Sequence, residues 1–145
     1  MPLDPERALQ KALINHLRAD AGLTALLISP AAIHDQPPEE IGWPHLLIGR
    51  SESRFVPADG SAMEHILTLT VRSRFGGTEE AKAINAAVRA ALTEPDLALE
   101  GGRIVSLRVT YQDVFRAADW TTTLGVSRVR VVTDDDAGLE DDDTT

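Results

Sequence analysis

The feature that most constrains the fold is a regular alternation of apolar and polar residues late in the chain. Apolar side chains at Val105, Leu107, Val109, Tyr111 and Phe115 are separated by polar ones. A period of two places successive side chains on opposite faces of a β-strand. We therefore expect a long or central strand here.

Three further stretches have the pattern of strands. Leu67, Leu69 and Val71 alternate with threonine and arginine, and an apolar run at 46–48 follows a proline-rich loop. Ile33 is expected to begin a short strand. The last strand is predicted to start near Trp120, and its apolar residues change phase along the strand. We expect a β-bulge near Gly125 to account for that change.

Two segments have the period of helices. The first begins at Pro5, a first-turn proline that follows the capping residue Asp4, and runs to about position 20. An apolar turn or short helical stub then covers 23–28. The second helix spans 78–92, with Thr78 as its expected cap and an apolar stripe at helical spacing. Because its other sides carry mainly alanine, we expect this helix to be covered on two sides.

The order of these elements is helix, two strands, helix, two strands. Each strand pair suits a hairpin, and the chain lacks a repeated strand-helix-strand pattern. This order predicts an α+β fold with an antiparallel or mixed sheet of four to five strands and two helices packed on it. A length of 145 residues suits one domain, which we place at 1–132.

The charge of the chain is concentrated at its C-terminus. Residues 133–145 contain seven acids and no basic residue, and removing them changes the net charge of −9 to −2. We expect this acidic tail to be disordered, and to serve mainly solubility. No apolar run reaches the length of a membrane span, and the N-terminus has no secretory pattern, which favours a cytoplasmic protein.

Residue patterns that support catalysis or cofactor binding are missing from the sequence. There is no cysteine, and the four histidines lack metal-ligand spacing. Gly76-Gly77-Thr78 precedes a helix but lacks the lysine of a phosphate-binding loop. The serines lack the flanking glycines of a nucleophile elbow, so we expect no catalytic residue, no metal and no cofactor.

Arginine is the informative charged residue, with twelve copies against two of lysine. Arg72 and Arg74 share one strand face, and Arg128 and Arg130 share another. Arginine is favoured in protein interfaces, although the same residues also suit a solvated sheet face. Acidic neighbours argue against a DNA-reading surface. The segment 51–62 is predicted to be a long hairpin connection that reaches toward a partner.

Three stretches together resemble the tail-terminator, or tail-completion, family of long-tailed bacteriophages, prophages and gene transfer agents. The first contains Ala8–Leu13, Leu23–Leu27, Ile33–Pro37 and Pro44–Gly49. The second joins the strand at 67–72 to Gly76-Gly77 and the alanine-rich helix. The third runs from Tyr111–Arg116 through Thr123–Val126 to Arg128–Arg130. The resemblance covers residues 6–133, but the last hairpin has Asp119-Trp120 where the family often has Asp-Gly.

The resemblance implies a non-enzymatic virion protein that forms a homohexameric ring at the head-proximal end of a long non-contractile tail. The ring would stop growth of the tail tube, contact the neck or stopper protein, and let double-stranded DNA pass without sequence recognition. Such a protein would be cytoplasmic during assembly, without a membrane, and then part of the particle. The candidate interface residues are Arg50, Arg54, Phe55, Asp59, Arg72, Arg74, Ala83, Ala87, Ala90, Arg116, Asp119, Trp120, Arg128 and Arg130.

Two other readings stay open at this stage. One is another ring component of the same particle, such as the neck stopper or the tube protein. The other is a small-ligand-binding α+β domain, which would need a pocket lined by His45, His65, Asp113 or Tyr111.

Overall fold

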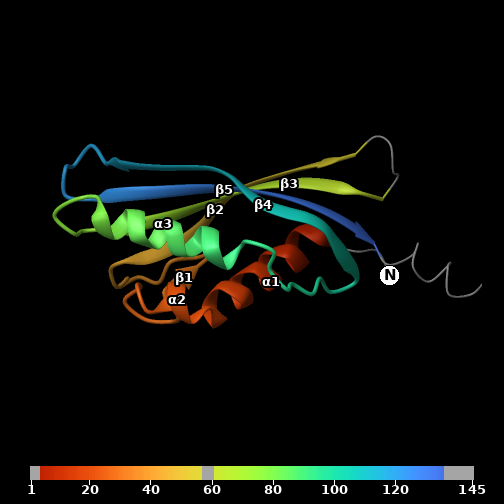
Figure 1. Ribbon diagram of the computed structural model, residues 1–145, viewed down its shortest axis with the longest axis horizontal. Coiled ribbons are helices and arrows are strands. Elements are labelled where there is room, and N and C mark those ends of the chain that lie inside the picture. Colours follow the sequence, from red (N-terminus) through yellow and green to blue (C-terminus); the bar gives the residue numbers. More distant parts are fainter. Residues whose placement is uncertain (1–3, 57–60, 136–145) are drawn as a thin grey trace, which may run out of the picture.

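In the computed structural model, which describes residues 4–56 and 61–135, one mixed sheet is joined to three helices (Figure 1). The elements in chain order are α1 (Pro5–Ala19), α2 (Ala21–Thr24), β1 (Ile33–His34), β2 (His45–Phe55), β3 (Met63–Ser73), α3 (Glu79–Ala91), β4 (Gly102–Arg116) and β5 (Thr123–Asp135). The α+β class and the element order predicted above are confirmed, with the stub after the first helix forming the single turn α2.

The strand order across the sheet is β1-β2-β3-β5-β4. The short β1 runs parallel to β2, and every other neighbouring pair is antiparallel. The pairs β2–β3 and β4–β5 are the two expected hairpins. β4 is long, as its alternation predicts, but it lies at the edge of the sheet.

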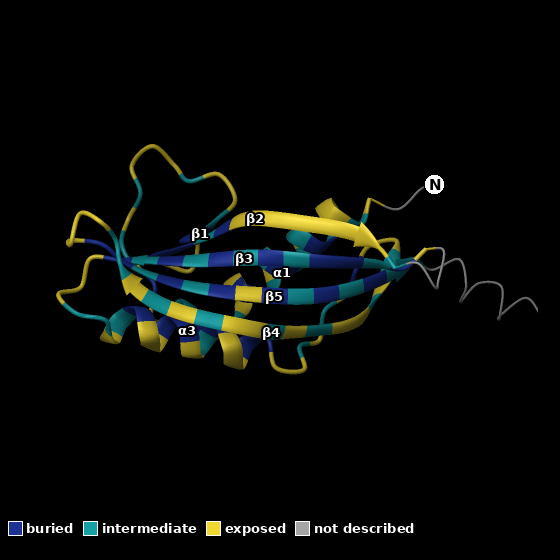
Figure 2. Ribbon diagram, turned by 90° about the horizontal axis from the view of Figure 1, so that it is seen from above, coloured by how far each residue is buried: buried dark blue, intermediate teal, exposed yellow. Residues whose placement is uncertain are grey.

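All three helices cover one face of the sheet and leave the other uncovered (Figures 1 and 2). The core lies between them, where α1 contributes three leucines and α3 contributes Ile84 and Val88, all buried. They pack against inward residues of β3 and β5, including Leu69 and Val131. We call the uncovered side of the sheet the open face.

Helix starts follow local chemistry at two of three places. The Asp4 side chain accepts a hydrogen bond from the backbone N–H of Arg7, and Asp20 accepts one from Leu23 at 2.9 Å. These bonds satisfy N–H groups that have no partner within the helix. Thr78 stands at the start of α3 as predicted, but its side chain makes no capping bond.

The prediction of a long hairpin connection at 51–62 is wrong in its first half. Residues Ser51–Phe55 continue β2 and pair with Met63–Leu67 of β3. Residues 57–60, including Asp59, lie outside the described part of the chain.

The predicted bulge near Gly125 is also wrong. The pairing of β3 with β5 is continuous through this residue, and burial alternates along β5 without a break. The register shifts of the β4–β5 pair lie in β4 instead, at Ile104/Ser106 and at Val109/Tyr111. β5 begins at Thr123 and not at Trp120, and it extends to Asp135, so its end takes in the first residues predicted for the acidic tail.

Candidate assembly surfaces

The open face carries a charged network at the end near the β2–β3 hairpin. The Glu64 carboxylate accepts a hydrogen bond from Arg54 Nε at 2.6 Å and another from Arg130 Nε at 2.6 Å. Only 11% of the Glu64 side chain is exposed. The bonds from Arg130 and then Arg54 lower the pKa of Glu64 below its usual range. Three neighbouring strands are therefore joined by one ionised carboxylate.

A second cluster lies further along the open face, where β4 meets β5. The guanidinium of Arg128 lies over the Tyr111 ring at 5.0 Å, and the Tyr111 hydroxyl donates to Asp113 at 3.1 Å. The Asp113 carboxylate raises the pKa of Tyr111 through this bond and through its charge. Because 46% of Tyr111 is exposed, an aromatic surface remains available beside these charges.

The opposite end of the molecule presents two exposed aromatic rings. Phe75 follows β3 and is 51% exposed, and Trp120 in the β4–β5 turn is 72% exposed. Arg116 links the two loops, because its guanidinium donates to the carbonyl of Gly76 at 2.9 Å and to that of Trp120 at 3.2 Å. We call Phe75, Arg116, Asp119 and Trp120 the aromatic tip.

The turn at the aromatic tip is held by the Asp119 side chain. Its carboxylate accepts from the backbone N–H groups of Thr121 and Thr122, both at 2.9 Å, and from the Thr122 hydroxyl at 3.0 Å. The backbone bonds lower the pKa of Asp119. Trp120 has φ 61°, a conformation that favours glycine. A large, exposed ring is therefore held in a locally strained position, as at many binding sites.

A cation–π stack lies near the start of β2. Arg72 and Arg74 place their guanidinium carbons 4.6 and 3.9 Å from the centre of the Trp43 ring. Beneath Trp43, the fully buried His45 donates from Nδ1 to the carbonyl of Gly42 at 2.7 Å. Burial lowers the pKa of His45. The stack thus fixes two arginines in defined positions.

The outer side of α3 carries several alanines beside the exposed Glu79, Lys82 and Arg89. Ala83 and Ala90 are exposed and Ala87 is half-buried. On the inner side, Asn85 Nδ2 donates to the Asp113 carbonyl at 3.2 Å, and Gln112 donates to the Asn85 carbonyl at 2.8 Å. This network fixes α3 on β4, so its alanine side has a defined orientation and little bulk.

The predicted interface residues fall into separate regions. Arg116, Asp119 and Trp120 meet at the aromatic tip, whereas Arg54 and Phe55 lie at the other end of the sheet. Of the other predicted arginines, Arg128 and Arg130 belong to the two clusters on the open face, which also carries Arg72 on β3 and Arg50, which pairs with Glu52 at 2.6 Å. Sequence reasoning missed Phe75, Trp43 and Glu64. A single aromatic residue in a loop carried the only available signal for the first two.

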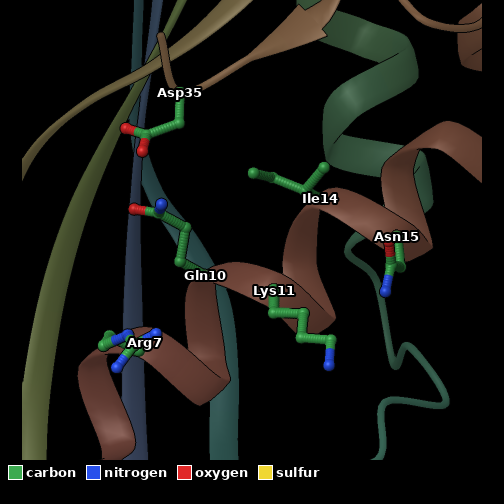
Figure 3. A pocket seen from close by; sticks show the side chains of 6 residues that line it. All are labelled: Arg7, Gln10, Lys11, Ile14, Asn15 and Asp35. Atoms are coloured by element: carbon green, nitrogen blue, oxygen red, sulfur yellow. The ribbon is translucent and has the colours of Figure 1, made fainter.

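The open hollows on the surface are lined by both polar and apolar side chains. One, between α1 and the segment after β1, is lined by Arg7, Gln10, Lys11, Ile14, Asn15 and Asp35 (Figure 3). Residues suggested for a small-ligand pocket do not converge, because His65 points to the helix side while Tyr111 and Asp113 lie on the open face. Within 4–56 and 61–135, no group of three or more metal-binding side chains occurs. No helix in these ranges is long and apolar enough to span a membrane.

Comparison with known proteins identifies the class of protein to which these surfaces belong. The family model described as tail completion protein gp17 matches residues 11–134. The chain belongs to this family and is a structural protein of the tail of phage-like particles.

A chain of the solved virion of a native gene transfer agent particle is similar in sequence and in fold. It is 27% identical to this chain, with a TM-score of 0.82. The match covers 92% of this chain and 99% of that one. A search among curated proteins found no significant match.

Proposed function

We propose that this protein forms a homohexameric ring at the head-proximal end of a long non-contractile tail. The ring ends polymerisation of the tail tube and joins the tail to the neck or stopper protein. Double-stranded DNA passes through its lumen without sequence recognition. The observation that carries this proposal is the match to the tail completion family over residues 11–134, supported by the similarity to a virion chain.

The surfaces of the chain support a role in a layered assembly. A closed ring needs two unlike surfaces on each copy, which meet head to tail. The alanine side of α3, along the β4 edge of the sheet, and the opposite edge at β2 supply such a pair. The aromatic tip lies at one end of the strands, where it is free to contact a protein stacked above or below. Exposed Trp and Phe with nearby Arg are typical of residues that dominate binding energy.

The proposal is tested by removing the protein during particle assembly. Particles assembled without it should have tails of uncontrolled length that fail to join to heads, and adding purified protein should restore both properties. Labelled protein should appear at the head-proximal end of the tail. Tails of normal length and normal attachment in its absence would contradict the proposal. Label along the whole tube would instead indicate a tube protein.

A further inference from the structure

The sheet has two edges that are free of neighbouring strands along most of their length. β1 pairs only with Leu46 and Leu47, so among the described strands nothing lies beside the later part of β2. At the other side of the sheet, the last strand is β4, which pairs only with β5. Free edges present unpaired backbone N–H and C=O groups, which readily bond to a further strand.

The later part of β2, Ser51–Phe55, is unusually exposed for a strand. All its residues are exposed, including those that point toward the helices, and Phe55 is 68% exposed. Ser51 and Ser53 line a hollow together with Glu6, Arg7 and Gln10 of α1. Figure 2 shows this half of β2 as a continuous exposed ribbon. It is therefore paired on one side, by β3, and open on the other.

The strand directions make the two edges compatible. Because β2–β3, β3–β5 and β5–β4 are all antiparallel, β2 and β4 run in opposite directions. When the ring axis runs along the strands, the rotation that relates one copy to the next leaves the direction of each strand unchanged. In a ring of this kind, β2 of the next copy therefore arrives antiparallel to β4. We propose that copies join by antiparallel pairing of β4 in one copy with Ser51–Phe55 of the next. This inference rests on the ring proposed above.

Charge supports this pairing. Through successive strand pairs, Glu52 lies opposite Ile66, Ile66 opposite Arg130, and Arg130 opposite Arg108, so all four share one row of the open face. Continuing the row into the next copy brings its Glu52 beside Arg108. No ion pair found among the described residues includes Arg108. Its segment, Ser106–Val109, is also the regular stretch between the two register shifts of β4.

The helices accommodate the same contact. α3 runs along the β4 edge of the sheet, and β2 lies toward the other edge (Figure 2). When the two edges pair, α1 of the next copy comes alongside α3. The exposed residues of α3 include the alanines Ala83, Ala86 and Ala90, and Ala86 lines a hollow beside β4 together with Lys82 and Arg89. Small side chains allow two helices to approach closely without clashes.

The chain has no cysteine, so engineered cysteines test this contact directly. One cysteine replaces Glu52, and the second replaces Ser106, Arg108 or Tyr111 in turn. These positions share the open face opposite Val132, Arg130 and Arg128 of β5, so they sample the register in steps of two β5 residues, as a tilt of the strands would require. Under mild oxidation, we expect one of the three double variants to form disulfides between copies, extending to closed multimers. The control pair is Glu39→Cys with Arg108→Cys, because Glu39 is also exposed but belongs to the loop between β1 and β2 and not to Ser51–Phe55.

Each single-cysteine variant shows whether identical edges meet instead. Strong dimer formation by Arg108→Cys alone would indicate two-fold pairing of β4 with β4 and would overturn the proposal. Multimers that are present by mass but give no disulfide in all three double variants would refute the edge pairing and leave the ring intact. A chain that stays monomeric at every concentration would refute the edge pairing of the free protein, while the particle-assembly experiment judges the ring separately.

A charge exchange gives an independent measurement. We expect Arg108→Glu to weaken assembly by roughly fivefold in dissociation constant, the effect of losing one exposed ion pair. Adding Glu52→Arg should restore assembly because the pair is re-formed in reverse. If the double variant assembles no better than Arg108→Glu alone, these two residues do not meet.

Discussion

Gly125 allows β5 to lie directly against α3. A Cβ atom at this position would lie 2.8 Å from Asn85 Oδ1, and Asn85 is itself only 4% exposed and held by its bond to Asp113. Gly125→Ala should therefore lower the free energy of unfolding by about 1–3 kcal/mol, as overpacking in a dense interior does. Urea unfolding measures this. The matched control is Gly77→Ala, where nothing lies within 4 Å of the new Cβ and stability should change little.

Two buried histidines and the half-buried His34 should make the fold sensitive to mild acid. Burial lowers the pKa of His34, His45 and His65. Below the usual histidine pKa of about 6.5, the unfolded chain therefore binds more protons than the folded chain, and stability falls as the pH falls. We expect the free energy of unfolding to decrease from pH 7.5 to about pH 5.5, where other side chains titrate little.

His65 offers a variant that isolates this effect. Its two ring nitrogens contact the Ser53 hydroxyl at 3.1 Å and the Thr133 hydroxyl at 2.8 Å. His65→Gln retains polar groups but removes the titration, so its unfolding free energy should vary less with pH over this range. An unchanged slope in the variant would show that His65 is not one of the responsible groups.

At the scale of elements, the β4–β5 turn separates stability from binding. Trp120→Gly should keep or raise stability, by up to about 1 kcal/mol, because glycine adopts a positive φ without strain. Trp120→Ala keeps the strained backbone and also removes the ring. If the aromatic tip is a docking surface, both variants should bind the adjoining tail or neck protein at least about fivefold more weakly. Thermal unfolding and pull-down with purified tails measure the two effects.

The elements with one buried face were predictable from sequence, and the exceptions have physical reasons. The segment Ser51–Phe55 has no buried face, so it lacks the alternation that marks a strand. In β5, the buried positions opposite α3 are held by Gly125 and Ser127, while Leu124 and Val126 point to the open face. The apolar residues therefore lie on the open face in the first half of this strand and on the buried face in the second half. This change of face resembles the effect of a bulge, although the pairing is continuous.

The candidate surfaces were only partly predictable. Exposed arginines and Trp120 could be recognised as interface residue types. Their grouping could not, because Phe75 and Trp120 are brought together by the bonds of Arg116 across two separate loops. Likewise, Glu64 follows the alternation of its strand, and only the sheet places it between Arg54 and Arg130.

In the whole molecule, contacts between copies within one ring should be separable by mutation from contacts between the ring and its neighbours along the tail. In the proposed ring, the edges of the sheet join neighbouring copies, whereas the aromatic tip lies at one end of the strands. We expect Trp120→Gly to form normal rings that fail to join their neighbours. Arg108→Glu should retain its fold and form fewer rings. Negative-stain imaging of each purified variant, with tail binding measured in parallel, distinguishes these outcomes. A Trp120→Gly variant that neither forms rings nor binds tails would contradict this division.

We propose that the chain works by assembling into a closed ring. Native mass measurement of the purified protein over a range of concentrations tests it most directly. We predict a discrete species with the mass of six copies, which is retained on dilution into the micromolar range and is seen end-on as a six-fold ring. A protein that stays monomeric at high concentration, and that also fails to bind isolated tail tubes, would rule out the proposed ring.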